Sequence, residues 1–496
     1  MRKIVMALDQ GTTSSRTILF DEKGQLIASA SRGFATHFPQ SGWVEQDPED
    51  LWNSQKETII EALFMAKLKM KNISAIGITN QRETVIAWNS VTGESIGPAI
   101  VWQCRRTADY CKQLVAEGFD RTIHNKTGLV TDAYFSGTKM RWILKNRPDA
   151  KQLAKQGKLR FGTVDTWLIW KLSKGQSHVT DVSNASRTMV YNIFDSQWDD
   201  ELLEKLEIPK TTLPEVKGSS EVVASTNAED WGSAVPIAGV AGDQQAALFG
   251  QACFDEGMAK NTYGTGCFLL LNTGNKAVLS DNGLLTTIAW KIGGKVTYAL
   301  EGSVFIGGAL IQWLRDKLEV FKDAADTEAM ALSIESADGL YVVPAFVGLG
   351  APHWDSYARG LMIGITGNTN KNHVVRASLE AIAYQSFDLI KVFEQDAGIS
   401  LKVLRVDGGA AANNFLCQFQ SDILGIEVIR PRMIETTAMG AAFLAGLATG
   451  VWKDQNHIKQ LEQEYKRFES QKNQSETVQL ISGWRKAMER SKNWID

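Results

Sequence analysis

A polar segment near the N-terminus, Asp9–Arg16, separates two short apolar runs of the chain. These runs, Ile4–Leu8 and Thr17–Phe20, predict a strand on each side of a tight turn. Glycine lets a backbone approach an anion closely, and hydroxyls, turn N–H groups and a guanidinium can donate to its oxygens. The segment carries all of these groups: Gly11, Thr12, Thr13, Ser14 and Arg16. It therefore favours a phosphate-binding loop over a polar β-turn closed by its own side-chain hydrogen bonds.

The carboxylate of Asp9 opens this loop and lies beside the expected phosphate. Mg²⁺ prefers oxygen ligands and keeps several of its water molecules, so a single carboxylate can hold it through water. Asp9 is therefore a candidate magnesium ligand.

The length of 496 residues is too great for one ordinary core, so we expect two large domains. A net charge of −3 gives no reason to expect nucleic acid or a membrane surface as a partner. Five scattered cysteines predict free thiols in a reducing cytoplasm. The N-terminus lacks the apolar length of a signal peptide. The apolar stretch Thr436–Trp452 is interrupted by threonines and small residues, and it predicts a buried helix and no membrane insertion.

Apolar strands that run into an Asp or Asp/Gly turn occur at three places along the chain. They end at Asp9, at Gly242-Asp243 and at Asp407-Gly408-Gly409. This repetition predicts an α/β protein of two similar halves, residues 1–250 and 251–496, whose turns meet at a shared cleft. The crossing between the halves is expected at about residues 245–258. The expected strands are Ile4–Leu8, Thr17–Phe20, Leu26–Ala30, Ile73–Thr79, Thr84–Asn89, Val235–Ala241, Phe268–Asn272 and Val403–Val406, and the expected helices Asp47–Lys69, Arg105–Glu117, His457–Glu469 and Glu476–Lys492.

Two longer motifs, Tyr134–Leu144 and Gly360–Glu380, accompany the N-terminal loop. With Asp9–Arg16 they resemble the FGGY carbohydrate kinases of the actin, hexokinase and heat-shock ATPase superfamily, over most of the chain. The resemblance is nearest to the members that phosphorylate glycerol. It implies an α/β fold of two actin-like ATPase (ribonuclease H-like) domains facing a central cleft. It also implies transfer of phosphate from ATP, with Mg²⁺, to glycerol, which gives sn-glycerol 3-phosphate.

The resemblance implies a nucleotide site made from several loops. The chain has neither a G-x-x-x-x-G-K-[S/T] loop nor the H-R-D and D-F-G motifs of protein kinases, so ATP would bind between the two halves. Taken alone, Gly264-Thr265-Gly266 could be a plain hairpin turn, and Gly307-Gly308 could serve close helix packing. The family's pattern instead makes these segments walls of the nucleotide site. The nucleotide-binding residues implied are Thr12, Thr13, Ser14, Arg16, Thr265, Gly308, Gln312, Gly409 and Asn413.

The acceptor site follows from the same resemblance. Its implied residues for the glycerol hydroxyls are Arg82, Glu83, Tyr134, Asp243 and Gln244, and its carbons would lie between Trp102 and Phe268. Without this context, Arg82 and Glu83 would be a surface ion pair and the aromatic residues would belong to a core. Arg82 and Glu83 follow the strand Ile73–Thr79, at the strand end where α/β proteins bind ligands.

Asp243 is the expected general base, because it follows an apolar strand and can accept the proton of the attacking hydroxyl. Asp9 and Arg16 would complete the catalytic group by stabilising charge on the transferring phosphate. Asp9 and Asp243 are the expected Mg²⁺ ligands. An aspartate at a strand end can instead cap a helix, and the two roles are compatible.

Two rival functions stay open at this point. One is a pentulose kinase of the same family, and the other is a non-enzymatic ATP-driven switch such as a chaperone or cytoskeletal ATPase. The expected partners are glycerol and ATP, with no nucleic acid, in a cytoplasmic homo-oligomer (a dimer or tetramer). The loop Ser225–Ala234 contains no histidine, so control by histidine phosphorylation, known in some relatives, is not carried over.

Overall fold

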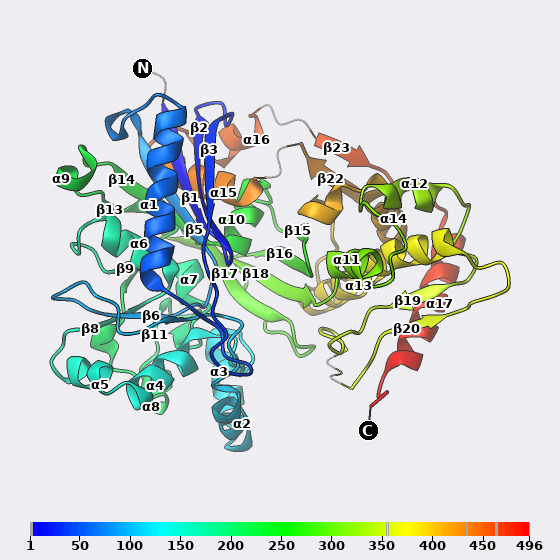
Figure 1. The fold of residues 1–496 in the computed structure, drawn as a ribbon, viewed down its shortest axis with the longest axis horizontal. Coiled ribbons are helices and arrows are strands. Elements are labelled where there is room, and N and C mark those ends of the chain that lie inside the picture. The colour runs from blue at the N-terminus through cyan, green and yellow to red at the C-terminus, as the bar shows by residue number, and fades with distance from the viewer. Residues whose placement is uncertain (1–2, 354, 356, 433–434, 462–464, 496) are drawn as a thin grey trace.

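The computed structural model describes residues 3–353, 355, 357–432, 435–461 and 465–495. Each half of the chain builds one large mixed sheet (Figure 1). The first sheet has the order β13 (Ser220–Ser225), β14 (Pro236–Gly242), β5 (Ala75–Asn80), β1 (Ile4–Gln10), β2 (Ser14–Asp21), β3 (Leu26–Gly33). The second has the order β17 (Leu285–Ile292), β18 (Lys295–Val304), β16 (Cys267–Gly274), β15 (Met258–Tyr263), β21 (Val403–Asp407), β22 (Glu427–Pro431), β23 (Tyr465–Phe468).

The two sheets follow the same plan. In the first, β1, β2 and β3 form an antiparallel meander, and β5 and β14 continue it as parallel strands. In the second, β15, β16 and β18 form the meander, and β21 and β22 are the parallel strands. Each sheet closes with an antiparallel edge strand, β13 or β23. The α/β fold of two similar halves is therefore confirmed, and β17 is an addition to the second.

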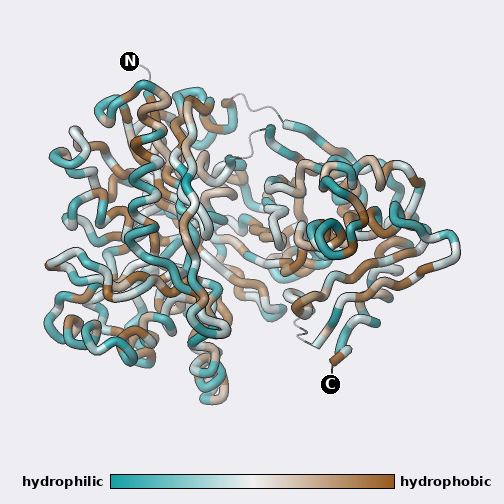
Figure 2. Tube along the Cα trace, in the orientation of Figure 1, coloured by the Kyte–Doolittle hydropathy of each residue, from teal (hydrophilic) through white to brown (hydrophobic). Residues whose placement is uncertain are grey.

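Both faces of the first sheet are buried, because its strands alternate side chains between two helical layers. Met6 and Leu8 of β1 belong to the core under α1 (Pro48–Met65) and α6 (Val164–Leu172). Val5 and Ala7 point the other way, toward α10 (Asp243–Gly250) and α15 (Thr436–Ala448). Figure 1 shows α15, in orange, among the blue strands of the opposite end of the chain. In Figure 2 brown stretches lie mainly along the strands, and the outer loops are mostly teal.

Helix α15 approaches its neighbours at backbone distance. A Cβ atom on Gly77 of β5 would lie 2.1 Å from the carbonyl oxygen of Ala441. A Cβ atom on Gly440 of α15 would lie 1.8 Å from the carbonyl oxygen of Ala246 in α10. Since real side chains do not reach such distances, only glycine fits at these crossings. They allow a helix from the second half of the chain to pack on the first sheet.

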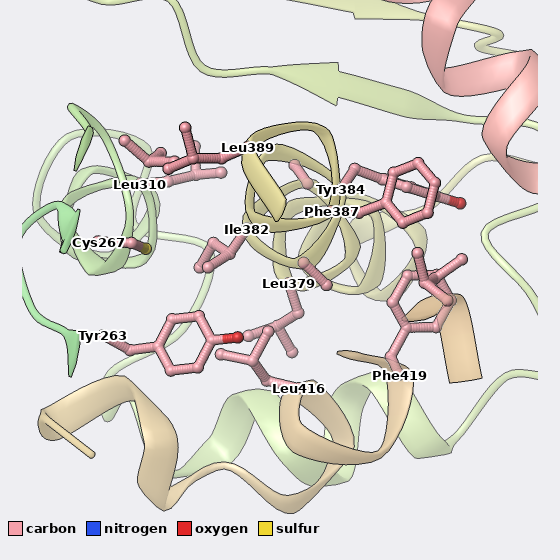
Figure 3. Close-up of a cluster of buried hydrophobic side chains, with 14 of the residues drawn as sticks. Tyr263, Cys267, Leu310, Leu379, Ile382, Tyr384, Phe387, Leu389, Leu416 and Phe419 are labelled. Atoms are coloured by element: carbon pink, nitrogen blue, oxygen red, sulfur yellow. The ribbon is translucent and has the colours of Figure 1, made fainter. Parts of the chain in front are cut away.

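The core of the second half surrounds the long helix α13 (Lys371–Ala397) and is shown in Figure 3. Side chains of α13 contact Tyr263 at the end of β15, α11 (Gly308–Asp316) and α14 (Asn414–Leu424). The Tyr263 hydroxyl also donates to Oε1 of Gln420 at 2.6 Å. This core thus supports the segments from which the nucleotide site is expected.

The remaining elements complete the two halves. The small strands pair as β4 (Glu45–Gln46) with β7 (Ala99–Ile100), β6 (Ile86–Asn89) with β8 (Leu159–Gly162), β9 (Val179–Asp181) with β12 (Glu215–Lys217), β10 (Tyr191–Asn192) with β11 (Gln197–Trp198), and β19 (Tyr341–Val343) with β20 (Leu361–Ile363). The other helices are α2 (Ala108–Ala116), α3 (Asp120–Thr127), α4 (Ser136–Asn146), α5 (Pro148–Lys155), α7 (Val182–Ala185), α8 (Asp200–Lys205), α9 (Ala228–Trp231), α12 (Asp326–Leu332), α16 (Gln455–Lys459) and α17 (Gln474–Ser491). Short 3₁₀ turns occur at Met70–Asn72, Lys210–Thr212 and Gly409–Ala412.

The expected helix His457–Glu469 is wrong. The chain forms only the short α16 there, and Tyr465–Phe468 is the edge strand β23, paired antiparallel with β22. Pairing with the exposed edge of the second sheet outweighs the helical propensity of this charged segment. Residues 462–464 lie outside the described residues. Thr436–Trp452 does contain a buried helix, α15, and no helix in the described ranges is long and apolar enough to cross a membrane.

The contact between α10 and α15 predicts that Gly440→Ala destabilises the protein. The new methyl group would meet the Ala246 carbonyl oxygen, and we expect a loss of about 1–3 kcal/mol in the free energy of unfolding. Thermal and urea unfolding measure this loss. The control is Gly367→Ala, because no atom lies within 4 Å of a Cβ at that position. Equal stability of the two variants would contradict the close packing.

Candidate functional site

The first loop connects β1 to β2, and its two ends are held together by the antiparallel ladder. Asp9 on β1 lies directly opposite Arg16 on β2, and the Gly11 N–H donates to the Ser14 carbonyl at 2.9 Å. Thr12 and Ser14 are partly exposed, and Thr13 is exposed. The hydroxyls that were expected to bind phosphate are therefore accessible in this turn.

Arg16 has a partner that the sequence did not suggest. Its Nη1 donates to both carboxylate oxygens of Glu435, at 2.9 and 2.8 Å. Glu435 immediately precedes α15, so this ion pair joins the first loop to a segment of the second half. The Arg16 side chain is 41% exposed and can still reach a ligand.

The carboxyl group of Asp9 lies in a strongly desolvated position. Burial raises its pKa to about 7; Arg16 lowers the pKa, and the nearby carboxylates of Asp243 and Glu435 raise it. Within the described part of the chain, no side chain donates a hydrogen bond to the Asp9 carboxylate. Asp9 and Asp243 are thus close enough to interact, and a cation between them would relieve the cost of their negative charges.

A buried group of ionic side chains lies behind the first loop. Arg82, just after β5, pairs with Glu301 of β18 through two hydrogen bonds of 2.5 and 2.9 Å. Arg187, just after α7, bridges the same group, with Nε 2.6 Å from Glu83 and Nη2 3.0 Å from Glu301. Arg82 Nε also lies 3.1 Å from Asp243 Oδ1. Two guanidinium groups are therefore held among three carboxylates.

Burial and pairing act in opposite directions on this group. Burial would raise the pKa of Glu301, but Arg187 and Arg82 outweigh it and lower the pKa to about 2. Burial raises the pKa of Glu83, and the same two arginines oppose this shift. Arg82 and Glu83 are each only 2% exposed, whereas Asp243 is 34% exposed. Asp243 is thus the member of the group that a ligand reaches most easily.

The backbone of Glu83 is held in an unusual conformation. Its φ is +62°, in the left-handed region that side chains other than glycine, asparagine and aspartate rarely adopt. The Ser136 hydroxyl donates to the Glu83 carbonyl at 3.0 Å. Fully buried Lys139 donates to the carbonyls of Ala133, Tyr134 and Phe135 at 2.7, 2.5 and 3.0 Å. The motif Tyr134–Leu144 therefore supports the acceptor residues through main-chain contacts.

The aromatic residues expected at the acceptor site come from both halves. Trp102 and Tyr134 pack edge to face with ring centroids 5.5 Å apart, and Trp102 Nε1 donates to Thr12 Oγ1 at 3.1 Å. Arg187 lies over the Tyr134 ring at 5.7 Å. Phe268 lies on β16, and its carbonyl oxygen accepts a hydrogen bond from Lys260 at 3.3 Å. Lys260 also donates to Gln244 Oε1, so its ammonium group links the side chain of Gln244 to the main chain of Phe268.

The start of α11 packs against the Gly264 turn, near several of the nucleotide residues expected in the second half. Gly308 N–H donates to the Gly264 carbonyl at 2.9 Å, and a Cβ on Gly308 would lie 2.7 Å from that oxygen. Thr265, Gly409 and Gln312 are all exposed near this junction or on its helix. The side chain of Asn413 accepts from Leu416 N–H at 3.0 Å and donates to Thr327 at 3.1 Å. It caps α14 in this structure.

Comparison with known proteins identifies the family. Residues 4–250 match the N-terminal domain and residues 259–449 the C-terminal domain of the FGGY family of carbohydrate kinases. The chain belongs to this family. "Glycerol kinase 1" of Clostridium tetani is 59% identical to this FGGY kinase over 494 residues, which cover 100% of this chain and 99% of that protein. "Glycerol kinase" of Clostridium botulinum (strain 657) is 57% identical over the full length of both.

A solved structure gives the same result. The crystal structure of Plasmodium falciparum glycerol kinase with ADP superposes with a TM-score of 0.93 at 38% sequence identity. The match covers 99% of this chain and 98% of that one. The fold of this FGGY kinase is therefore that of a known kinase over its whole length.

Sequence reasoning missed four charged residues of this FGGY kinase: Lys260, Arg187, Glu301 and Glu435. For two of them a signal was present, because each is the lone charge in an otherwise uncharged strand. Lys260 lies in Met258–Tyr263, and Glu301 in Val296–Val304. A lone charge in a strand that is otherwise buried requires a partner. Arg187 and Glu435 lie in short connecting segments, where a charged residue is common and does not indicate a buried partner.

The buried ionic group predicts that Glu301→Gln lowers the stability of this FGGY kinase. Two arginines would face each other without their shared carboxylate, and removal of one partner from a buried pair costs about 3–5 kcal/mol. Urea unfolding monitors the loss. The control is Asp316→Asn, which removes an exposed carboxylate paired with its neighbour Arg315. An equal midpoint for Glu301→Gln and wild type would contradict the inferred charge compensation.

Proposed function

We propose that this FGGY kinase is a glycerol kinase, which transfers the γ-phosphoryl group of ATP to a primary hydroxyl of glycerol. The products are sn-glycerol 3-phosphate and ADP, the entry step of glycerol catabolism. One observation carries the proposal: proteins named glycerol kinase are 57–59% identical to the chain over its whole length. The Plasmodium falciparum glycerol kinase was solved with ADP, which supports the choice of nucleotide.

The acceptor residues suit a small polyol. Arg82 supplies donors and Glu83 supplies acceptors, and both are nearly buried, so only a small molecule would reach them together. Asp243 and Gln244 begin α10 beside this pair, and Tyr134 and Trp102 close the other side. We assign glycerol hydroxyls to Arg82, Glu83, Tyr134, Asp243 and Gln244, with Trp102 and Phe268 next to its carbons.

Asp243 is the general base in this proposal. Its carboxylate is held by Arg82 Nε at 3.1 Å and accepts the Gln244 N–H at 2.7 Å, which fixes its direction. The carboxylate takes the proton of the attacking hydroxyl as the oxygen of glycerol bonds to the γ-phosphorus and the bond to ADP breaks. Arg16 and the donors of the first loop stabilise charge on the transferring group.

Mg²⁺ fits beside Asp9 and Asp243. The Asp9 carboxyl is desolvated and receives no side-chain donor within the described residues, so a cation would supply the missing compensation. Within the described residues, no group of three or more His, Cys, Asp or Glu side chains is placed to hold a metal ion. Mg²⁺ keeps several of its waters and needs only one or two carboxylates from the protein. When bound, Mg²⁺ would neutralise charge on the phosphates.

The nucleotide would lie between the first loop and the start of α11. Thr12, Thr13 and Ser14 offer hydroxyls to the phosphates from one side, and Thr265 offers one from the other. Gly308, Gln312 and Gly409 would line the base and ribose. Asn413, which caps α14 at the edge of that pocket, would be a hydrogen-bonding partner of the purine or ribose.

Three further properties belong to the same proposal. The division into domains 1–250 and 251–496 is supported by the separate sheets of the two halves. A cytoplasmic location is supported by five free cysteines.

A homo-oligomer is supported by an apolar strip on α1, where Phe64 is 82% exposed beside Ile60 and Met65. Sedimentation equilibrium checks the last point, which a monomer at micromolar concentration would contradict.

The first functional prediction concerns the base. Asp243→Asn keeps the size and most hydrogen bonds of the side chain but removes the proton acceptor. We expect kcat to fall by roughly 10²–10⁴-fold, with a smaller change in KM for glycerol. A coupled assay of ADP formation measures this, with exposed Asp255→Asn as control. A kcat near that of wild type would refute the role of Asp243.

A comparison of acceptor substrates distinguishes a glycerol kinase from a pentulose kinase and from an ATP-driven switch. Each buried polar group left without its partner costs about 1–3 kcal/mol, so 1,2-propanediol should lose roughly 10–100-fold in kcat/KM relative to glycerol. Xylulose should be the poorer substrate, because Trp102 and Phe268, proposed to lie beside the glycerol carbons, would leave no room for a five-carbon chain. Glu83→Gln should reduce this discrimination. A preference for xylulose would support a pentulose kinase, and ADP formation that does not depend on any acceptor would support an ATP-driven switch.

A further inference from the structure

Lys260 is a fully buried lysine beside the acceptor site, and none of the roles proposed above uses it. It lies on β15 and has no exposed surface. Its ammonium group is surrounded by three oxygen atoms: Oε1 of Gln244, Oγ1 of Thr262 at 2.9 Å and the carbonyl oxygen of Phe268 at 3.3 Å. Two of these partners belong to its own hairpin, and Gln244 belongs to the first half.

The register of the second sheet explains how Lys260 reaches Gln244. Lys260 pairs with Leu270 on β16, and Leu270 pairs with Glu301 on β18. Residues directly opposite one another in a sheet point to the same face. Lys260 and Glu301 therefore project from one face, two strands apart. Glu301 meets Arg82 and Lys260 meets Gln244, so this face supports two acceptor residues at once.

The charge on Lys260 is compensated by its surroundings. Burial lowers the pKa of its ammonium group, and the carboxylates of Asp407, Asp243 and Glu301 raise it. An ammonium group has three donors and no acceptor. A glutamine beside it turns its oxygen toward the lysine, because the ammonium group offers its NH₂ group no acceptor. The orientation of the Gln244 amide is thus determined by Lys260.

We propose that Lys260 is a positioning residue of the acceptor site, which turns the Gln244 amide so that its NH₂ group donates to an acceptor hydroxyl. This role rests on the proposed function, because it needs a polyol beside Gln244. It adds a donor that faces the substrate, complementary to the acceptor oxygens of Glu83 and Asp243. Without Lys260 the amide could rotate and present oxygen instead of NH₂.

The test is a double-variant cycle with Lys260→Met and Gln244→Ala. Methionine keeps an unbranched apolar chain and removes the ammonium group. We expect Lys260→Met to raise KM for glycerol by about 10-fold or more and to change KM for ATP by less than about 2-fold. If Lys260 acts through Gln244, its replacement in the Gln244→Ala background should change KM for glycerol by less than about 2-fold. The proposal would be overturned if the two substitutions raised KM for glycerol independently, so that their effects multiplied in the double variant. It would also be overturned if Lys260→Met raised KM for ATP as much as KM for glycerol.

A second variant keeps the proposal falsifiable if Lys260→Met does not fold. Gln244→Glu retains an oxygen for Lys260 but has no NH₂ group for the acceptor. We expect KM for glycerol to rise by about 10-fold or more, with KM for ATP unchanged. An unchanged KM for glycerol would overturn the assigned orientation.

Wild-type turnover of glycerol is measured before any variant. Absence of turnover overturns the proposed function and this role with it. Turnover of glycerol by wild type, together with unchanged KM for glycerol in both Lys260→Met and Gln244→Glu, overturns the role of Lys260 alone. Either way, the two failures are distinguishable.

Discussion

Charge compensation around two buried arginines determines the acceptor side of this molecule. Arg82 and Arg187 are held by carboxylates from both halves of the chain, and Glu301 of the second sheet contacts both of them. Breaking a buried ion pair is costly even where forming it adds little stability. The group therefore acts mainly by fixing geometry. Because Glu301 reaches across from β18, the acceptor residues take their positions only when the two sheets are correctly placed.

One motif that stands out in the sequence, Tyr134–Leu144, lies mostly behind the acceptor residues and supports them. Ser136 of the motif Tyr134–Leu144 donates to the main-chain carbonyl of Glu83, whose backbone is left-handed, and Lys139 donates to carbonyls at the start of the motif. Strained backbone of this kind costs about 1–3 kcal/mol and persists only where its surroundings enforce it. A conspicuous sequence motif can thus contain residues that support the site as well as residues that react.

The strands that end in Asp or Asp/Gly turns could be predicted from the sequence, because a short apolar run followed by such residues is typical of a buried strand and its turn. The two-sheet fold followed from them. Contacts between distant segments could not be predicted in this way. Nothing near Arg16 or Arg187 in the chain indicates Glu435 or Glu301, and the helix expected at His457–Glu469 gave way to an edge strand that only the finished sheet can pair. The hydrogen bond from Asn413 to Thr327 likewise depends on α12 and α14 being neighbours.

Helix α15 determines how late during synthesis the core of the first half can be completed. The inner face of the first sheet, with Val5 and Ala7, is covered by a helix that ends at Ala448. At roughly 5–20 residues per second, a ribosome that has finished β14 needs on the order of 10–40 s to complete α15. During that interval this face has α10 but lacks α15. The core on this face is therefore complete only after residue 448 has been added to the chain.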